Sequence, residues 1–62
     1  MDFAQALVHA VKGEKITCKG WGPEDYLTVV KGILVDDGGS PYFDRIRVKE
    51  ILGEWKIWEE KN

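Results

Sequence analysis

The chain has 62 residues, 44% of them hydrophobic, with 9 basic and 11 acidic side chains and a net charge of −2. This length predicts a single domain over residues 1–62, and the acidic balance argues against general nucleic-acid binding. A single cysteine and a single histidine exclude an internal disulfide and the usual four-ligand zinc site.

Residues 2–12 have the pattern of an amphipathic helix. Asp2 is a favourable N-cap, and Gln5 three positions later completes a capping box. Gly13 supplies the left-handed position at which helices commonly end. The apolar side chains form one broad arc, which predicts that this helix packs against a core; they are Phe3, Ala4, Ala6, Leu7, Val8, Ala10 and Val11.

After Gly13 the apolar residues alternate with polar ones, as in half-buried strands. Strands are predicted over residues 15–19, 26–30, 33–35 and 54–58, with turns at 20–25, near Gly32 and at 36–40, and one helical turn over 49–52 that stops at Gly53. The segment from Pro41 to Val48 gives no clear pattern, because Pro41 can only open a strand or lie at a sheet edge. The sequence therefore predicts an α+β fold, with one N-terminal helix packed on a small antiparallel β-sheet.

The last predicted strand places large aromatic residues on both of its faces. Trp55 and Ile57 share one face, while Lys56 and Trp58 share the other. Because one helix covers only one face of a sheet, one of the two indoles points towards solvent, a partner subunit or a ligand. The pattern alone leaves open which of the two faces the core.

The length of the chain also favours self-association. Ordering it costs on the order of 1.5 kcal/mol per residue, which burial in so small a core barely offsets. Without a disulfide or a metal, oligomerisation is the remaining source of stability, and the three tryptophans suit an interface. We expect a homo-oligomer. No apolar run approaches the roughly 18 to 20 residues that span a bilayer. The start of the chain lacks a basic secretory signal region, so a cytoplasmic protein with a reduced Cys18 is expected.

Catalytic chemistry finds little support in the sequence. His9 falls on the polar side of the predicted helix, and Cys18 falls on the inner face of its strand, where a small apolar residue is typical. Asp36 and Asp37 belong to a turn composition, and the glycine-rich segments match no phosphate-loop or dinucleotide motif. We therefore expect no enzyme activity, no cofactor and no bound metal.

Binding finds more support, around residue 21. Lys15, Thr17 and Lys19 are predicted to project from one strand face, and Trp21 follows them in the turn "GWGPED". Ammonium, hydroxyl, amide and indole groups are what a nucleotide-like ligand requires. The alternative is that the lysines form a solvated face and that Trp21 folds back onto the core. We favour narrowly a Trp21 that the turn holds out towards a shared pocket.

The two ends of the chain resemble the Tad2-like family of phage and prophage proteins, the second type of Thoeris anti-defence protein. The family pattern has a start like "MxFxxAL", a Gly-Lys-rich step into a strand ending in "GW", and a close on "LxxxW" with a short apolar strand. The positions that match it are Met1, Phe3, Ala6, Leu7, Gly13, Lys15, Ile16, Lys19, Gly20, Trp21, Leu52, Trp55 and Ile57.

The resemblance implies a non-catalytic oligomer that sequesters a nucleotide-derived immune signal of the cyclic ADP-ribose type in the host cytoplasm. Together with the residue pattern, it makes the expected ligand-binding set Phe3, Trp21 and Trp55 or Trp58 for stacking, and Lys15, Lys19 or Arg47 for phosphate. Two alternatives stay open. One is a protein–protein inhibitor of a bacterial defence complex, of the anti-CRISPR type, which the acidic excess favours; the other is a phage accessory protein of unrelated role.

Overall fold

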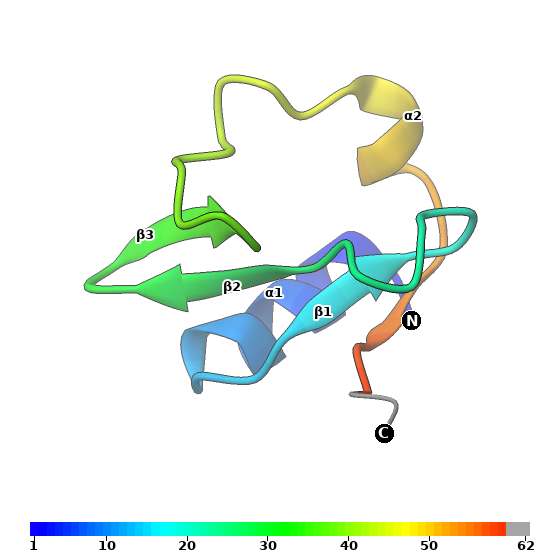
Figure 1. The fold of residues 1–62 in the computed structure, drawn as a ribbon. Coiled ribbons are helices and arrows are strands. Elements are labelled where there is room, and N and C mark those ends of the chain that lie inside the picture. The colour runs from blue at the N-terminus through cyan, green and yellow to red at the C-terminus, as the bar shows by residue number, and fades with distance from the viewer. Residues whose placement is uncertain (60–62) are drawn as a thin grey trace.

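The computed structural model, which describes residues 1–59, has the predicted α+β fold (Figure 1). Helix α1 (Phe3–Val11) lies behind the sheet in this view, and the short helix α2 (Val48–Ile51) lies apart from it, at the end of a long connection from β3. The strands are β1 (Ile16–Cys18), β2 (Leu27–Val30), β3 (Ile33–Asp36) and β4 (Trp55–Ile57). They form one antiparallel sheet in the order β3-β2-β1-β4. Among residues 1–59, no helix is long and apolar enough to cross a membrane.

Helix α1 begins at the predicted capping box. Asp2 Oδ1 accepts the Gln5 backbone N–H at 2.8 Å, and Gln5 Oε1 accepts the Asp2 N–H at 3.1 Å. Gly13, with φ of 95°, follows the helix in the left-handed region. These bonds satisfy backbone N–H donors that the first turn of a helix otherwise leaves without partners. Because they involve residues only three positions apart, the sequence predicted the start of this helix.

The apolar arc of α1 is narrower than predicted. Ala6 and Ala10 are buried, and Phe3 and Leu7 are half-buried against the core. The other predicted members, Ala4, Val8 and Val11, face solvent. The side of a helix that reaches a four-stranded sheet is limited, so the outer residues of a broad arc remain exposed.

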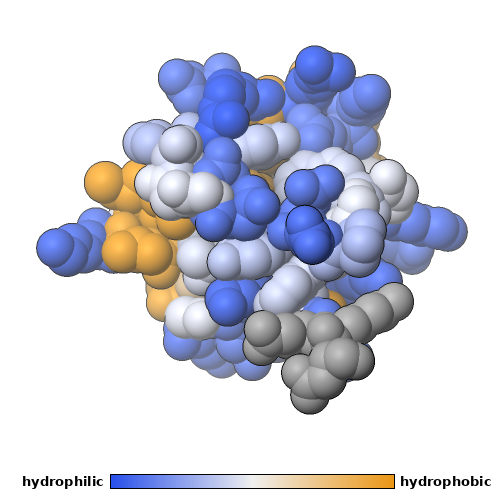
Figure 2. All heavy atoms as spheres, in the orientation of Figure 1, coloured by the Kyte–Doolittle hydropathy of each residue, from blue (hydrophilic) through white to orange (hydrophobic). Residues whose placement is uncertain are grey.

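Strands β2 and β3 form a tight hairpin. Lys31 and Gly32 connect them with φ of 52° and 78°, so both central residues adopt the left-handed conformation that suits a two-residue hairpin. In the view of Figure 2, apolar atoms gather at the left of the molecule, the side where Figure 1 places this hairpin. Val30 and Ile33, on either side of the turn, are both about half exposed, at 50% and 52%.

Both edge strands of the sheet form backbone hydrogen bonds with segments outside the sheet. Along β3, Asp36 N donates to Ser40 O at 2.9 Å and Tyr42 N donates to Leu34 O at 3.0 Å. Pro41 forms only an isolated bridge to Val35, which confirms the expected edge position. On β4, Trp55 N donates to Met1 O at 2.8 Å and Met1 N donates to Trp55 O at 2.9 Å.

The core lies between α1 and one face of the sheet. Trp55 is 1% exposed and packs on Phe3 with ring centroids 5.0 Å apart, so Trp55 is the indole of the last strand that faces the core. Trp58 follows β4 and belongs to the other side of the sheet. The buried side chains are Ala6, Ala10, Ile16, Thr17, Cys18, Leu27, Leu34, Val35 and Trp55.

Candidate functional site

An open groove of about 990 Å³ lies where β1 leads into the turn at residues 19–23. Its walls are the end of β1, this turn and the whole of β4 with the residues on either side of it. Gly20 has φ of 94°, and the turn is held by Asp25, whose carboxylate accepts the Gly22 N–H at 3.1 Å. A Cβ at Gly22 would lie 3.0 Å from that carboxylate, so the turn is closed tightly around Asp25.

Trp21 is half-buried at the inner end of the groove. Its ring meets Trp55 edge-on at 5.2 Å and Tyr42 edge-on at 5.9 Å between centroids, and its remaining surface lines the groove. The expectation of an indole held away from the protein is thus corrected, because one edge of Trp21 packs against the core. Both alternatives from the sequence, a ring held out towards a pocket and a ring folded back onto the core, therefore describe part of this side chain.

Trp58 anchors the turn from the other side. Its indole N–H donates to Pro23 O at 2.9 Å, and its ring lies 4.7 Å from that of Tyr26. Lys15 Nζ lies 4.9 Å from the centroid of Tyr26 and 5.2 Å from that of Trp58, so this ammonium makes cation–π contacts with both rings. Trp58 lines the groove, whereas Lys15 is not among the residues that line it.

Two other lysines line the groove. The side chain of Lys19 is 80% exposed, and its Nζ lies 3.8 Å from Glu54 at the rim, a long and solvated ion pair. Lys56 comes from β4, where it pairs in register with Thr17. Thr17 itself is 5% exposed and donates its hydroxyl to Asp25 O at 2.8 Å, so the predicted solvent-facing threonine is a buried structural residue.

Three of the predicted ligand-binding residues are not part of the groove: Phe3, Lys15 and Arg47. Trp55 belongs to its wall but is 1% exposed. Phe3 and Trp55 pack on each other in the core, and Trp55 also donates its indole N–H to Glu50 O at 2.8 Å. A ring that is 1% exposed offers little surface for stacking, so Trp58 is the better stacking candidate of the two. Arg47 stands directly before α2 and is not part of the groove.

The residues considered for catalysis lie where the sequence placed them. Burial raises the pKa of the Cys18 thiol, and the nearby Glu50 raises it further, which favours the protonated form of this sulfur. His9 lies on the surface of α1 with Nδ1 2.5 Å from Glu14 Oε2. Among residues 1–59, no three His, Cys, Asp or Glu side chains gather closely enough to hold a metal ion.

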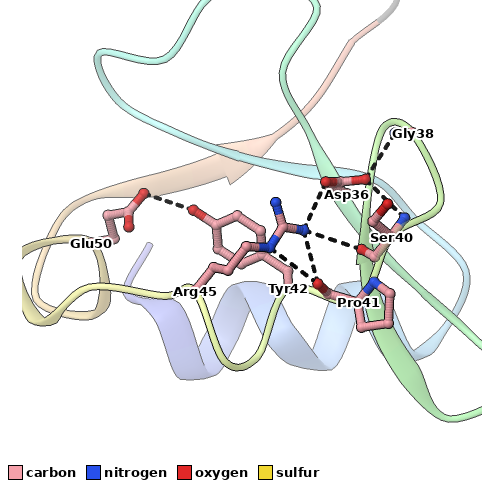
Figure 3. Close-up of polar contacts among 7 residues, drawn as sticks. All are labelled: Asp36, Gly38, Ser40, Pro41, Tyr42, Arg45 and Glu50. Carbon is pink, nitrogen blue, oxygen red and sulfur yellow. Dashed lines mark hydrogen bonds and ion pairs between the residues drawn. The ribbon is translucent and has the colours of Figure 1, made fainter.

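A second, smaller cleft of about 270 Å³ is lined by acidic residues. It adjoins the other side of Trp21, and four carboxylates and two tyrosines line it: Asp25, Asp36, Asp37, Glu50, Tyr26 and Tyr42. Figure 3 shows Arg45 reaching across this region, with Nη2 2.8 Å from Asp36 and the guanidinium 5.0 Å from the Tyr42 centroid. Burial and the neighbouring Glu50 raise the pKa of Tyr42 to about 12. Trp21 therefore separates a groove with exposed lysines from an acidic cleft.

The ion pair of Asp36 predicts a pH dependence of stability. Arg45 donates to the Asp36 carboxylate, and the Ser40 and Gly38 N–H groups also do so, which lowers the pKa of this carboxyl below its ordinary value of 3.8. A carboxyl whose pKa is lower in the folded than in the unfolded state stabilises the protein at pH values above its unfolded-state pKa. This contribution is lost as the pH falls through the folded-state pKa. Asp36→Asn keeps an Oδ1 for the two N–H groups but removes the charge. We expect wild type to melt higher than Asp36→Asn at neutral pH, and we expect this difference to shrink as the pH falls below 3.8 and through the folded-state pKa of Asp36. A difference that does not change over this pH range would contradict this account.

Sequence reasoning missed Tyr26, Lys56 and Glu54. The sequence placed Lys15 on one strand face with Thr17 and Lys19, but it left open which face Trp58 takes. The strand order that brings their strands together was the missing information, because alternation gives the face of a residue but not its neighbours across the sheet.

In the comparison with known proteins, no family model, no curated protein and no solved structure matches this chain.

Proposed function

We propose that this chain is a non-catalytic binding protein that takes a nucleotide-derived ligand into the groove and holds it unchanged. The observation that carries the proposal is the meeting of Trp21 and Trp58 with Lys19 and Lys56 around one open space of about 990 Å³. Bases stack on indoles for about 1 to 3 kcal/mol each, and phosphates take lysine donors.

The volume suits a ligand larger than a single small metabolite. Ligand sites commonly measure about 300 to 1,000 Å³, and this groove lies near the upper end. The resemblance to the Thoeris anti-defence family suggests the chemical class, a signal of the cyclic ADP-ribose type, and the setting, a phage protein that withdraws this signal from a host immune response. The groove residues supply the means, which are the indole rings of Trp21 and Trp58 and the ammonium groups of Lys19 and Lys56.

Titration calorimetry with cyclic ADP-ribose isomers and cyclic oligonucleotides tests the proposal. We expect one of these ligands to bind and to be recovered chemically intact after release from the denatured complex. If none binds more tightly than about 1 mM, which corresponds to roughly 4 kcal/mol, the proposal fails. Recovery of a cleaved ligand would refute the non-catalytic part alone.

The lysines of the groove are expected to contribute through phosphate. Lys19→Gln with Lys56→Gln should weaken binding by about tenfold or more per lysine, because a hydrogen bond to a charged group contributes about 1.5 to 3 kcal/mol. The matched control is Lys12→Gln with Lys31→Gln, which removes the same charge from exposed positions outside the groove. Calorimetry on both variants checks this, and equal losses in the two would mean that net charge, not the groove, attracts the ligand.

The acidic cleft favours one alternative, an inhibitor that binds a basic surface of a host defence protein. Asp25, Asp36 and Asp37 present carboxylates there beside aromatic rings, a combination that suits arginine or lysine side chains of a partner. Pull-down from a host lysate discriminates between this inhibitor and the nucleotide-binding protein proposed above. A stable protein partner that binds without any nucleotide, and is lost in Asp25→Asn with Asp37→Asn, would favour the inhibitor.

A further inference from the structure

Helix α2 turns Glu50 towards the protein and its apolar side chains towards solvent. Glu50 is half-buried, and its Oε2 accepts the Tyr42 hydroxyl at 3.0 Å (Figure 3). Its Oε1 accepts the Arg47 N–H at 3.0 Å. Its backbone oxygen accepts the indole N–H of Trp55. Hydrogen bonds through one glutamate thus fasten α2 to the core, and none of its residues is buried.

The outward side of α2 is made of large aliphatic residues. Val48 is 70% exposed, Ile51 41% and Leu52 80%. These positions are spaced at i, i+3 and i+4, so the three side chains share one face of the helical turn. We call this the α2 face. A surface helix ordinarily turns such a stripe towards its own core, and an apolar face turned outward is typical of a contact surface.

We propose that the α2 face is the contact between two copies of this chain, packed against each other around a two-fold axis. Such an axis brings the same patch together from both copies, so the patch has to complement itself. The three aliphatic residues of the α2 face would pack against the same three residues of the second copy, at the centre of the contact.

The charges around the α2 face are also self-complementary. Arg47 and Lys49 stand at the start of α2, and Glu54 follows its end; all three are exposed. When two α2 turns lie antiparallel across the axis, the basic start of each faces the acidic end of the other. This pairing forms twice by symmetry and selects a second copy over a partner of uniform charge.

The size of the molecule permits such a contact. A stable interface needs about 800 Å² per partner, which is roughly a sixth of the 4528 Å² that this chain exposes. Glu54 also lines the groove, so the second copy would lie next to the groove rim. The self-contact itself does not depend on what the groove binds.

Sedimentation velocity over a wide concentration series tests the proposal. We expect wild type to pass from monomer to dimer as its concentration rises, and Leu52→Glu to raise the dimer Kd by at least about thirtyfold, as for a central interface residue. Val11→Glu is the control, because it places the same carboxylate on a valine of α1 that is 66% exposed; it should dimerise like wild type. Circular dichroism checks that both variants fold.

Cross-linking gives an independent readout. Leu52→Cys should form a disulfide-linked dimer under mild oxidation, because Cys18 is buried and the new thiols meet near the axis. Val11→Cys should not. A wild type that stays monomeric throughout the series, or a dimer that Leu52→Glu leaves intact, overturns the proposal. So does a monomeric wild type whose α2 face captures a different protein instead.

Discussion

Trp55→Ala is expected to unfold the protein. Trp55 is the largest fully buried side chain, and its ring contacts both Phe3 and Trp21. Truncating a buried tryptophan typically costs about 3 to 5 kcal/mol. A chain of 62 residues has a total stability of only about 3 to 9 kcal/mol. The variant also leaves Glu50 O without its indole donor, which loosens α2. The loss is therefore at least about a third of the stability, and all of it at the lower end of that range.

Circular dichroism and denaturant unfolding check this result. Phe43→Ala is the matched control, because it also removes an aromatic ring but from a side chain that is 67% exposed, and it should unfold close to the wild-type midpoint. A Trp55→Ala variant that melts cooperatively within a few degrees of wild type would show that the packing of Trp55 contributes little.

Trp21→Ala is expected to separate folding from binding. The indole makes two edge-on aromatic contacts, each worth about 0.5 to 1.5 kcal/mol, so its removal should cost roughly 1 to 3 kcal/mol and leave a folded but weaker protein. Its exposed surface lines the groove. Loss of one stacking surface should therefore weaken the binding of the nucleotide-derived ligand by about five- to 150-fold.

Calorimetry below the melting point of the variant measures the binding, and thermal melting measures the stability. Trp21→Phe is the control, because it retains an aromatic ring for both the core contact and the ligand. It should lose less stability and less binding affinity than Trp21→Ala. Wild-type affinity in a folded Trp21→Ala would remove Trp21 from the ligand site.

The parts of the fold that the sequence predicted are those governed by local chemistry. Asp2 and Gln5 fix the start of α1 by bonds within four residues, and Gly32 marks the β2–β3 turn because its backbone needs positive φ. The helical turn before Gly53 was displaced by only one residue. In each of these places the signal and the structure lie in the same short segment.

The parts that escaped prediction depend on contacts between distant segments. Thr17 alternates with apolar residues like a surface position, yet the turn carrying Asp25 folds over it. Trp21 could be weighed only as presented or buried, because its neighbours Tyr42 and Trp55 come from residues 21 and 34 positions further along. The groove itself needs β4 beside β1, and strand order leaves little trace in a single sequence.

The partners along the two sheet edges affect how the protein behaves when crowded. Unpaired strand edges act as templates onto which further chains add, and such growth has no natural end. Here Leu34 and Asp36 on one edge and Trp55 on the other already hold backbone partners within the chain. Strand addition at these positions would first have to displace those bonds. Concentrated solutions should therefore reach small closed assemblies through side-chain contacts and stay clear, with no thioflavin-binding fibrils.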